Sequence, residues 1–430
     1  MLSVQVALQA PRAIRLRAGL ALGALSLLLG CAAVPGPAPT DAVGREDLLT
    51  RVWQLIDDRH VDPAPSGWAE ARERHRAAVL AAPPDDPEAL WVALDRMAGE
   101  RRDAHTRVEG PREVRRKRDD RGPSLGLALA QVEGQWVVDR VTPDSPAAAV
   151  GLTAGDRLLR WNGEAPDAVW ARGLAQARHS STAQAQGLTA LRQWLDGPEG
   201  SEVALQWEQA DGRVRSATLK RAELLFPPRA QLTRRDSGVA VLRWNRFDER
   251  LLPELTQALR DMGGSPGRGL ILDLRGNGGG SFDLTMRLLD LLLPESQVVQ
   301  LSAFRNGPRR DPYRAGGPKA LYKGPLRVLM DAGSASGSEL LASVLQFTGR
   351  ARVLGDTSCG CLLAIRRHVD LAPDARLLIS EQALQLPDGR RVEGQGVQPD
   401  RRINRTRAAL AVGRDEVLEA AEAELTSTWP

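Results

Sequence analysis

Apolar residues recur at helical spacing in the first part of the chain. In LLTRVWQLI, residues 48–56, the apolar positions lie three and four apart, so they share one face of a helix. The segment ALWVALDRMAG, residues 89–99, repeats this pattern, and Pro87 and Glu88 just before it are typical of a helix start. The spacing predicts a small helical domain over residues 45–117.

The pattern changes to short apolar runs over residues 118–222. Dipeptides that favour tight turns separate these runs, such as Asn162-Gly163 and Asp211-Gly212. Runs of this length between turns are typical of strands, so they predict a small β-rich domain. The five runs are SLGLALAQV, QWVVDRV, DRLLRWNG, VALQWEQ and RSATLKRA.

Strand and helix patterns alternate over residues 223–430. Strand-like runs such as GLILDLRG and LRVLMDAG are followed by longer stretches with one apolar face, such as SFDLTMRLLDLLLP and SELLASVLQFTG. A strand–helix–strand order fits a crossover connection between parallel strands. The sequence therefore predicts a multidomain α+β and α/β protein, in which an α/β core follows the helical and β-rich domains.

The composition agrees with a folded protein of several domains. The chain has 430 residues, of which 42% are hydrophobic and 26% are charged. That length suffices for two or three domains with sizeable cores. The formal net charge is only +4, and the Arg and Lys residues are scattered rather than gathered in one stripe. These features argue against a nucleic-acid-binding protein.

Residues 1–31 are typical of an export signal. Arg12, Arg15 and Arg17 precede the apolar run AGLALGALSLLLG, which is too short to span a bilayer. The run leads into Leu-Gly-Cys31, which resembles the lipobox of bacterial lipoproteins, whose cysteine carries the lipid. An ordinary cleaved signal with an incidental cysteine is the alternative.

The lipobox resemblance implies a place in the cell envelope. A lipid on Cys31 would anchor the protein to a bacterial membrane, facing the periplasm, without a transmembrane helix. Ala32 rather than Asp follows the cysteine, which by resemblance favours the outer membrane. Residues 32–44 are rich in Pro, Ala and Gly and are typical of a flexible tether.

Three serines in DAGSASGSELL offer a candidate nucleophile. Ser334, Ser336 and Ser338 lie among small residues directly before a helical pattern. The free N–H groups at a helix start favour a developing negative charge, so the N–H of Gly337 is a candidate oxyanion donor. A serine hydroxyl is a weak nucleophile on its own, and the chemistry therefore also needs a base.

A glycine-rich run from Gly276 to Gly280 follows the strand pattern GLILDLR. Such a run lets the backbone approach a ligand closely, either a carbonyl oxygen or a phosphate. The Lys-Ser/Thr pair of a Walker-type phosphate-binding loop is missing from it, which argues against nucleotide binding.

The segment VTPDSPAAAVGLTAGDRLLRWNGE, within the β-rich domain, resembles a PDZ domain of the bacterial protease kind. The resemblance implies that Ser124, Leu125, Gly126 and Leu127 form the carboxylate-binding loop and the start of the strand after it. In that mode an extended peptide adds to the sheet edge, and backbone amides hold its terminal carboxylate. A β-rich domain with no peptide ligand is the alternative.

The order of the motifs resembles that of the C-terminal processing peptidases, also called tail-specific proteases. A helical domain, a PDZ segment, GLILDLRGNGGGS, AGSASGSELL, VLGDT and VEGQGVQPD follow in that order over nearly the whole mature chain. The resemblance implies a ClpP/crotonase-like α/β core at residues 223–430 and Ser336 as the nucleophile. It implies Gly280, with Gly279 next, as the second oxyanion donor, and it calls for no cofactor and no metal.

One residue of the family pattern is missing. Most members pair the serine with a lysine, but the residue 25 positions after Ser336 is Cys361. The segment ERRDAHTRVEG, which holds His105, resembles the region from which the tricorn core peptidase branch takes a histidine. The acid of that branch corresponds to Glu393 in RVEGQGVQPD. We therefore expect Ser336 as nucleophile, His105 as general base and Glu393 as the carboxylate that orients the imidazole.

Two further residues and the cysteines stay open at this point. His368 is a rival base, and Asp356 is a weaker candidate for a supporting hydrogen bond. Cys359 and Cys361 could pack as small buried residues, form a disulfide in an oxidising compartment, bind a metal or provide a reactive thiol.

Together these features predict an exported serine endopeptidase. It would recognise accessible C-terminal tails of proteins or peptides through the PDZ domain and hydrolyse peptide bonds via an acyl-enzyme on Ser336. The alternative is a catalytically inactive, PDZ-containing adaptor lipoprotein that binds tails without turnover, an interpretation that the missing lysine favours. We expect no nucleic-acid partner.

Overall fold

The computed structural model describes residues 36–264, 267–305 and 311–427. The predicted export signal and its Cys31 lie outside the described residues. Within those three ranges, no helix has both the length and the apolar character that a membrane span requires.

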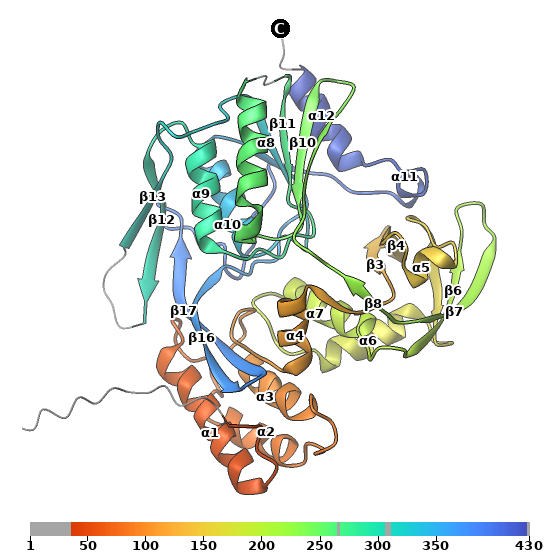
Figure 1. The fold of residues 1–430 in the computed structure, drawn as a ribbon, viewed down its shortest axis with the longest axis vertical. Coiled ribbons are helices and arrows are strands. Elements are labelled where there is room, and N and C mark those ends of the chain that lie inside the picture. The colour runs from red at the N-terminus through yellow and green to blue at the C-terminus, as the bar shows by residue number, and fades with distance from the viewer. Residues whose placement is uncertain (1–35, 265–266, 306–310, 428–430) are drawn as a thin grey trace, which may run out of the picture. The chain divides into compact units, whose positions relative to one another are not determined.

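A six-stranded sheet forms the centre of the C-terminal half (Figure 1). Its strands lie in the order β18-β15-β14-β11-β10-β9, and all neighbours are parallel except β9, which is antiparallel to β10. Parallel strands buried on both faces need nearly continuous apolar runs, which the predicted strands supply. The bounds are β9 Ala230–Arg234, β10 Val239–Trp244, β11 Gly269–Asp273, β14 Leu326–Met330, β15 Arg352–Gly355 and β18 Arg401–Arg402.

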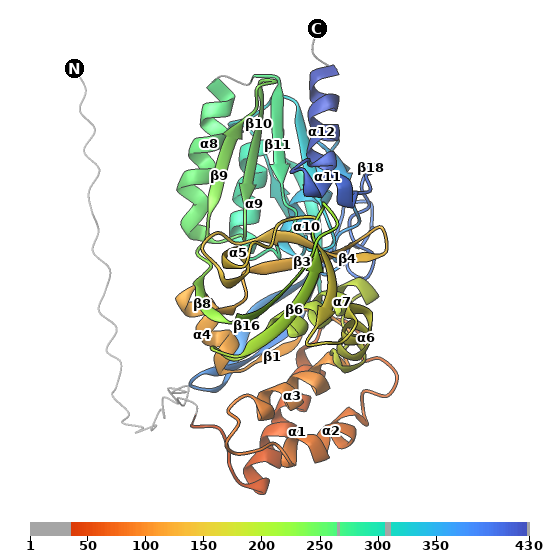
Figure 2. The same ribbon diagram turned by 90° about the vertical axis from the view of Figure 1, so that its right-hand side faces the viewer.

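Helices cover both faces of this sheet (Figures 1 and 2). Successive side chains of a strand point to opposite faces, so Ala240 and Leu242 of β10 pack against α8, α9 and α10, while Val239 and Val241 pack against α12. The bounds are η1 Glu249–Leu251, α8 Leu252–Gly264, α9 Phe282–Leu292, α10 Gly337–Phe347, α11 Arg407–Ala411 and α12 Glu416–Ser427.

The crossover unit predicted around the serines is present. Strands β14 and β15 are parallel neighbours, and α10 connects them. In such a unit the turn from strand to helix lies at the carboxyl edge of the sheet, where α/β proteins usually carry their functional groups.

A second sheet joins early and late parts of the chain. Strand β17 pairs with β1, β16 and β12, and β12 also pairs with β13, all antiparallel. The bounds are β1 Arg107–Glu109, β12 Gln297–Phe304, β13 Asp311–Ala315, β16 Leu363–Ala372 and β17 Ala375–Gln385.

The N-terminal helices complete their core with this second sheet. Helices α1 (Ala42–Arg59), α2 (Ala71–Leu80) and α3 (Ala89–Gly99) are present where helices were predicted. However, Leu49 and Leu94 share one core with Leu377 and Ile379 of β17. Three short helices present more apolar surface than they can cover among themselves, so the hairpin β16–β17 closes the core.

Residues 121–225 form the predicted β-rich domain, called the β domain below. One sheet has the order β3-β4-β5-β6-β7, and β2 pairs with β8 where the chain enters and leaves. Helices α6 and α7, between β5 and β6, were not predicted. Helix α4 (Pro111–Asp119) precedes this domain. The bounds within the domain are β2 Arg121–Ser124, β3 Leu127–Val132, β4 Gln135–Val141, α5 Pro146–Ala149, β5 Arg157–Trp161, α6 Pro166–Gln176, α7 Ala183–Leu195, β6 Glu202–Glu208, β7 Val214–Lys220 and β8 Ala222–Leu225.

Tryptophan packing fixes α7 on the β-domain sheet. The ring of Trp194 in α7 lies edge-on to Trp136 and Trp161, with centroid distances of 4.9 and 5.3 Å. Aromatic pairs in this arrangement add to the stability from buried area alone. These contacts hold the C-terminal end of α7 on the sheet, and the start of the same helix contacts the site described next.

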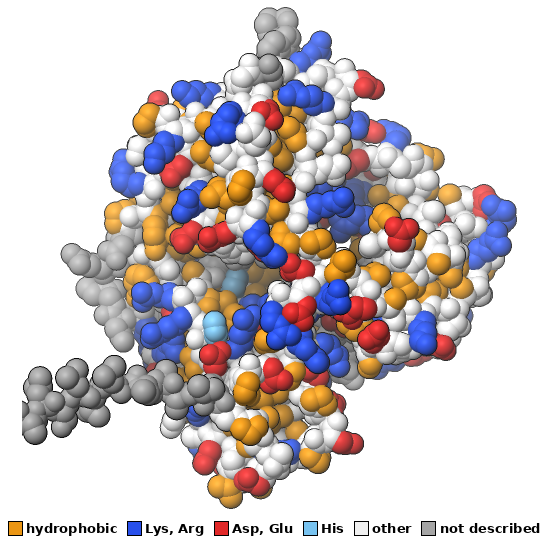
Figure 3. Space-filling model, in the orientation of Figure 1, with side chains coloured by type: hydrophobic (Ala, Val, Ile, Leu, Met, Phe, Trp, Pro, Cys, Tyr) orange, Lys and Arg blue, Asp and Glu red, His pale blue; other side chains and the backbone are white. Residues whose placement is uncertain are grey.

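Charges of both signs are interspersed on the face drawn in Figure 3. Opposite charges also pair directly in the described chain, as Arg275 does with Asp273 at 2.8 Å and with Asp415 at 2.6 Å. This face therefore carries no stripe of one sign, in agreement with the small net charge.

Candidate active site

Ser336 caps the start of α10, at the turn after β14. Its backbone has φ 54° and ψ −113°, a left-handed conformation that a residue with a side chain adopts only under constraint. Its Oγ lies 3.1 Å from Nε2 of His105. A nucleophile and a base within hydrogen-bond reach are the two groups that acyl transfer requires first.

The two neighbouring serines have structural partners instead. Ser334 Oγ donates to the carbonyl of Leu274 at 2.9 Å, and Ser338 Oγ donates to that of Asn277 at 2.8 Å. Both serines are fully buried. They fasten the serine turn to the loop after β11, so of the three only Ser336 contacts a base.

The carboxylate of Glu339 organises the loop that carries the two cysteines. It accepts the N–H of Ser336 at 2.8 Å, and from the loop it accepts Ser358 Oγ at 2.6 Å, Gly360 N–H at 2.7 Å and Cys361 N–H at 3.0 Å. Burial raises the pKa of Glu339, and these hydrogen bonds oppose that rise by favouring the ionised form. Glu339 was not among the residues predicted from the sequence, although a Glu three residues after a capping Ser often bonds the cap.

Glycine N–H groups beside Ser336 form a candidate oxyanion hole. Gly337 opens α10, so its N–H has no partner inside the helix, and the N–H of Gly280 is not engaged by any described group. A Cβ built on Gly337 would lie 3.5 Å from the Gly280 nitrogen. Gly279 was the other expected donor, but its N–H donates to the Asn277 side chain at 2.9 Å. The geometry favours Gly337 with Gly280.

His105 is held through its backbone. Asp103 Oδ1 accepts the N–H of His105 at 2.7 Å and that of Thr106 at 2.8 Å, and Asp103 Oδ2 lies 2.8 Å from Nε2 of His60. Burial alone would raise the pKa of Asp103, but His60 and Ser380 hold it well below its ordinary value. Asp103, His60 and Ser380 were not predicted from the sequence, although Asp103 stands in the same Asp-x-His-Thr segment as His105.

The His105 ring is neutral and can accept a proton. Burial lowers the pKa of His105 to about 4, and the charge of Arg107 acts in the same direction. Nε2 faces the serine. Nδ1 is buried and has no hydrogen-bond partner in the part of the chain that the structure describes.

Glu393 lies beside the site without the expected bond to the imidazole. Its Oε2 accepts the N–H of Leu362 at 2.5 Å, because a buried carboxylate needs a donor and the main chain supplies one. Burial raises the pKa of Glu393 to about 8, and the charge of Asp103 adds to the rise. The structure thus places Glu393 within electrostatic range of the site but does not place it in direct contact with the ring.

His368 and Asp356 do not reach the serine. His368 lies on β16 with its side chain 50% exposed, and its Nε2 is 3.3 Å from Asp370 Oδ1. Asp356 is also largely exposed and pairs with Arg402 at 3.2 Å. Each side chain pairs with an oppositely charged or titratable neighbour at the surface, so neither is placed to act as a base or to support one.

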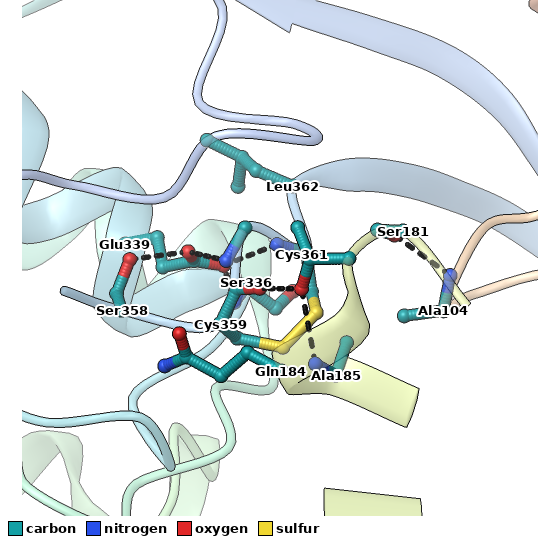
Figure 4. The surroundings of a disulfide bond; sticks show 12 residues. Ala104, Ser181, Gln184, Ala185, Ser336, Glu339, Ser358, Cys359, Cys361 and Leu362 are labelled. Atoms are coloured by element: carbon teal, nitrogen blue, oxygen red, sulfur yellow. Dashed lines mark hydrogen bonds between the residues drawn. A yellow bond between two sulfur atoms is a disulfide. The ribbon is translucent and has the colours of Figure 1, made fainter. Parts of the chain in front are cut away.

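Cys359 and Cys361 form a disulfide at the position where the family pattern has its lysine (Figure 4). Both are buried and pack against Ala185 and Leu188 of α7. The two cysteines are therefore both disulfide-bonded and packed as small buried residues, two of the interpretations left open by the sequence. The carbonyl of Cys361 accepts the N–H of Ser336 at 3.1 Å. Among the described residues, no group of three or more His, Cys, Asp or Glu is placed to hold a metal.

The segment expected to bind a carboxylate lies at a free sheet edge. Ser124 ends β2, and Leu127 begins β3, which pairs with β4 alone among the described strands. Gly126 has φ 77°, and its N–H donates to Ser124 Oγ at 3.0 Å. Leu125 is buried in the domain core. The outer edge of β3 is therefore not paired with another described strand, which is the kind of edge to which an extended peptide can add.

Residues 238–403 match the model of peptidase family S41. The matched segment contains the central parallel strands, Ser336, both favoured oxyanion glycines and Glu393, while His105 lies before it.

Curated relatives extend the likeness over most of the chain. A carboxyl-terminal-processing protease of Synechocystis sp. is 26% identical over 390 residues, which cover 88% of this chain and 86% of that protein. The chloroplastic C-terminal processing peptidase of Tetradesmus obliquus is 26% identical over 383 residues, 84% of this chain and 78% of that protein.

Solved structures share the fold. A photosystem II D1 C-terminal processing protease aligns with a TM-score of 0.56 at 23% identity, over 89% of this chain and 98% of that one. Mature CPAF, complexed with lactacystin, aligns with a TM-score of 0.66 at 14% identity, over 90% of this chain and 99% of that one. The mixed α/β fold predicted from the sequence is thereby confirmed.

We expect Gly279→Ala to inactivate the site while both reacting side chains remain. A Cβ at Gly279 would lie 2.6 Å from the Ala335 carbonyl oxygen and 2.6 Å from the Gly337 nitrogen, so the serine turn or the oxyanion donor must move. Misplacing these groups should lower kcat on unfolded casein by roughly 10²-fold or more. Gly278→Ala is the matched control, because no atom lies within 4 Å of its added Cβ. Equal activities of the two variants would contradict this account.

We expect a thiol titration of denatured, unreduced protein lacking residues 1–31 to find no free thiol, because the two remaining cysteines are bonded. Cys359→Ser combined with Cys361→Ser should lower the free energy of unfolding by only about 1–2 kcal/mol, since the closed loop is very short. Activity should fall more clearly, because that loop supports Ser336. Two free thiols, or a fully active double variant, would speak against this role.

Proposed function

We propose that this chain, a serine-type peptidase of family S41, uses His105 as the base of Ser336 to cleave proteins near their C-terminal tails. The observation that carries the proposal is the 3.1 Å contact between Ser336 Oγ and His105 Nε2. The unengaged N–H groups beside it and the carboxyl-terminal-processing relatives support the reaction and the substrate class.

In the proposed reaction, His105 Nε2 removes the hydroxyl proton as Ser336 Oγ attacks the carbonyl carbon of the scissile bond. The N–H groups of Gly280 and Gly337 stabilise the negative charge that forms on the carbonyl oxygen. The imidazolium then gives its proton to the leaving amine, and the acyl part stays on Ser336 as an ester. Water, deprotonated by the imidazole, attacks that ester, and the imidazolium returns the proton to Ser336 Oγ as the ester bond breaks and the acid product leaves.

Glu393 acts in this proposal through its charge. An ionised carboxylate near the imidazole stabilises the imidazolium, which the burial of His105 disfavours. Because burial raises the pKa of Glu393 to about 8, the support is complete only at mildly alkaline pH.

The β domain is proposed to be a PDZ domain that captures substrate tails. The free edge of β3 supports this role, since an extended tail can add there as a further strand. The loop from Ser124 to Leu127 lies at the start of that edge, where the terminal carboxylate would bind.

Export and a lipid anchor at Cys31 are proposed from the sequence. The anchor would hold the protein on a bacterial membrane, facing the periplasm, and the tether over residues 32–44 would give it reach. The disulfide between Cys359 and Cys361 supports an oxidising compartment.

We expect Ser336→Ala and His105→Ala each to lower kcat/KM by at least about 10³-fold, because one removes the nucleophile and the other removes the base. The measurement is hydrolysis of casein and of a tail peptide by protein lacking residues 1–31. His368→Ala, a change at an exposed histidine, should keep wild-type activity. Activity of the Ser336→Ala variant would refute an acyl-enzyme on Ser336. Wild-type protein that binds tail peptides without cleaving them would support the alternative of an inactive adaptor.

We expect kcat/KM to rise with pH in two steps. The first, near pH 4, follows loss of the His105 proton, and the second, near pH 8, follows ionisation of Glu393. Below each pKa the protonated form predominates, and in both cases that is the less active form. Glu393→Gln should remove the second step and keep the first, so a second step that persists in this variant would assign it to another group.

A further inference from the structure

The connection between α6 and α7 and the start of α7, residues 177–185, contact both halves of the candidate active site. One half is the segment 103–106, which carries the base. The other half is the cysteine loop, residues 357–361, which bonds the nucleophile because the Cys361 carbonyl accepts the N–H of Ser336 at 3.1 Å. The contacts on each side come from β-domain side chains.

On one side, the connection binds the main chain around the base. Arg178 Nη2 donates to the carbonyls of Asp103 and Thr106 at 2.7 and 2.9 Å, two residues before and one residue after the base. Ser181 Oγ accepts the N–H of Ala104 at 3.0 Å (Figure 4). Arg178 is only 9% exposed, so little water competes for its hydrogen bonds. The segment that carries the base is thus bonded to the connection at three main-chain groups.

On the other side, the connection binds the main chain of the cysteine loop. Thr182 Oγ1 donates its one hydrogen to the carbonyl of Cys359 at 2.7 Å. Gln184 Nε2 donates to the carbonyl of Thr357 at 2.9 Å. The approach is close, since a Cβ built on Gly360 would lie 2.7 Å from Thr182 Cγ2. The cysteine loop is therefore held against the start of α7 by directed hydrogen bonds.

We propose that Thr182, Gln184 and Arg178 are positioning residues, which fix the loop that bonds Ser336 and the segment that carries His105 relative to each other. The inference rests on the proposed function, in which His105 is the base of Ser336. It gives the β domain a part in bond cleavage itself, in addition to the capture of tails.

The two segments need a common anchor because the reacting residues are 231 residues apart in the chain. Glu339 bonds the serine turn and the cysteine loop, and Asp103 bonds the main chain of the base. Each carboxylate acts on its own half, whereas the connection bonds both halves. A displacement of about 1 Å between reacting groups can lower a rate by about 10²-fold, so even a small shift of one half matters.

The test measures the second-order rate constant at which a fluorophosphonate labels Ser336 at neutral pH. Ser336 Oγ attacks the phosphorus, its proton passes to His105, and fluoride leaves. The probe carries no peptide, so its reaction does not depend on tail capture by the β domain. We expect Thr182→Val and Gln184→Met, which keep the size of the side chain and remove its donor, each to lower this constant by roughly five- to tenfold.

Matched variants serve as controls for the loss of the donors. Gln186→Met makes the same change in the same helix, but Gln186 Nε2 donates at 3.4 Å to the carbonyl of Leu174, inside the β domain. Thr182→Ser keeps the hydroxyl, which also caps α7 by accepting the N–H of Ala185. Both controls should be labelled at the wild-type rate.

Arg178→Met extends the test to the half that carries the base. The charge of Arg178 helps to lower the pKa of His105, so loss of the charge alone would make the ring more basic and would not slow labelling at neutral pH. Loss of the two hydrogen bonds should slow it by roughly tenfold. A rate at or above that of wild type would contradict positioning by Arg178. Thermal melts check that each variant is folded, and the two neutral variants decide if Arg178→Met is not.

A second readout separates positioning from peptide binding. If the connection served only to bind tails, Thr182→Val and Gln184→Met would raise KM for a tail peptide and leave kcat and the labelling rate unchanged. That result would overturn the inference. Positioning predicts a lower kcat together with slower labelling.

The proposed function and this inference fail in distinguishable ways. If wild type neither cleaves nor is labelled, or if Ser336→Ala is labelled equally, the function falls and the inference falls with it. If wild type is labelled at Ser336, and Thr182→Val and Gln184→Met are labelled as fast as Gln186→Met, only the inference is overturned.

Discussion

The buried carboxylate of Glu339 is the interaction on which the rest of the site depends. A charge inside a protein is unfavourable unless hydrogen bonds replace the water that it loses. Here the donors come from the residue that caps α10 and from the loop of the two cysteines, so the charge is stable only when both segments are in place. The constrained backbone of Ser336 persists because its N–H is bound in this way, which leaves its hydroxyl free for the base.

A second buried carboxylate, Asp103, does the same for the other half of the site. It binds main-chain N–H groups of the segment that carries His105, and it also hydrogen-bonds the side chains of His60 and Ser380. The contact between Ser336 and His105 therefore joins two main-chain segments. The carboxylate of Glu339 fixes the segment of Ser336, and the carboxylate of Asp103 fixes the segment of His105. Geometry set by the backbone explains how the ring can keep its place although Nδ1 has no described partner.

Local patterns were sufficient for much of the fold and for part of the site. Strands β10, β11, β14 and β15 are buried on both faces, so their sequences are nearly continuous apolar runs that predict strands. The hairpin β16–β17 was not predicted, since its partners lie hundreds of residues away and one strand is half exposed. Residue type and motif order indicated Ser336 and His105. Glu339 and Asp103 were overlooked although their positions carried a signal, and that the N–H of Gly279 is already bonded could not be predicted, because peptide orientation is not visible in residue type.

The core shared by the N-terminal helices and the hairpin β16–β17 also determines when the protein becomes active. Helices α1–α3 are made first, yet their apolar face stays uncovered until residues 363–385 are available. His105 and Ser336 are themselves 231 residues apart. Contacts of such long range form late in folding, because a large loop must close before they contribute. An incomplete chain therefore lacks the contact between Ser336 and His105, so under the proposed function proteolysis begins only when the fold is complete.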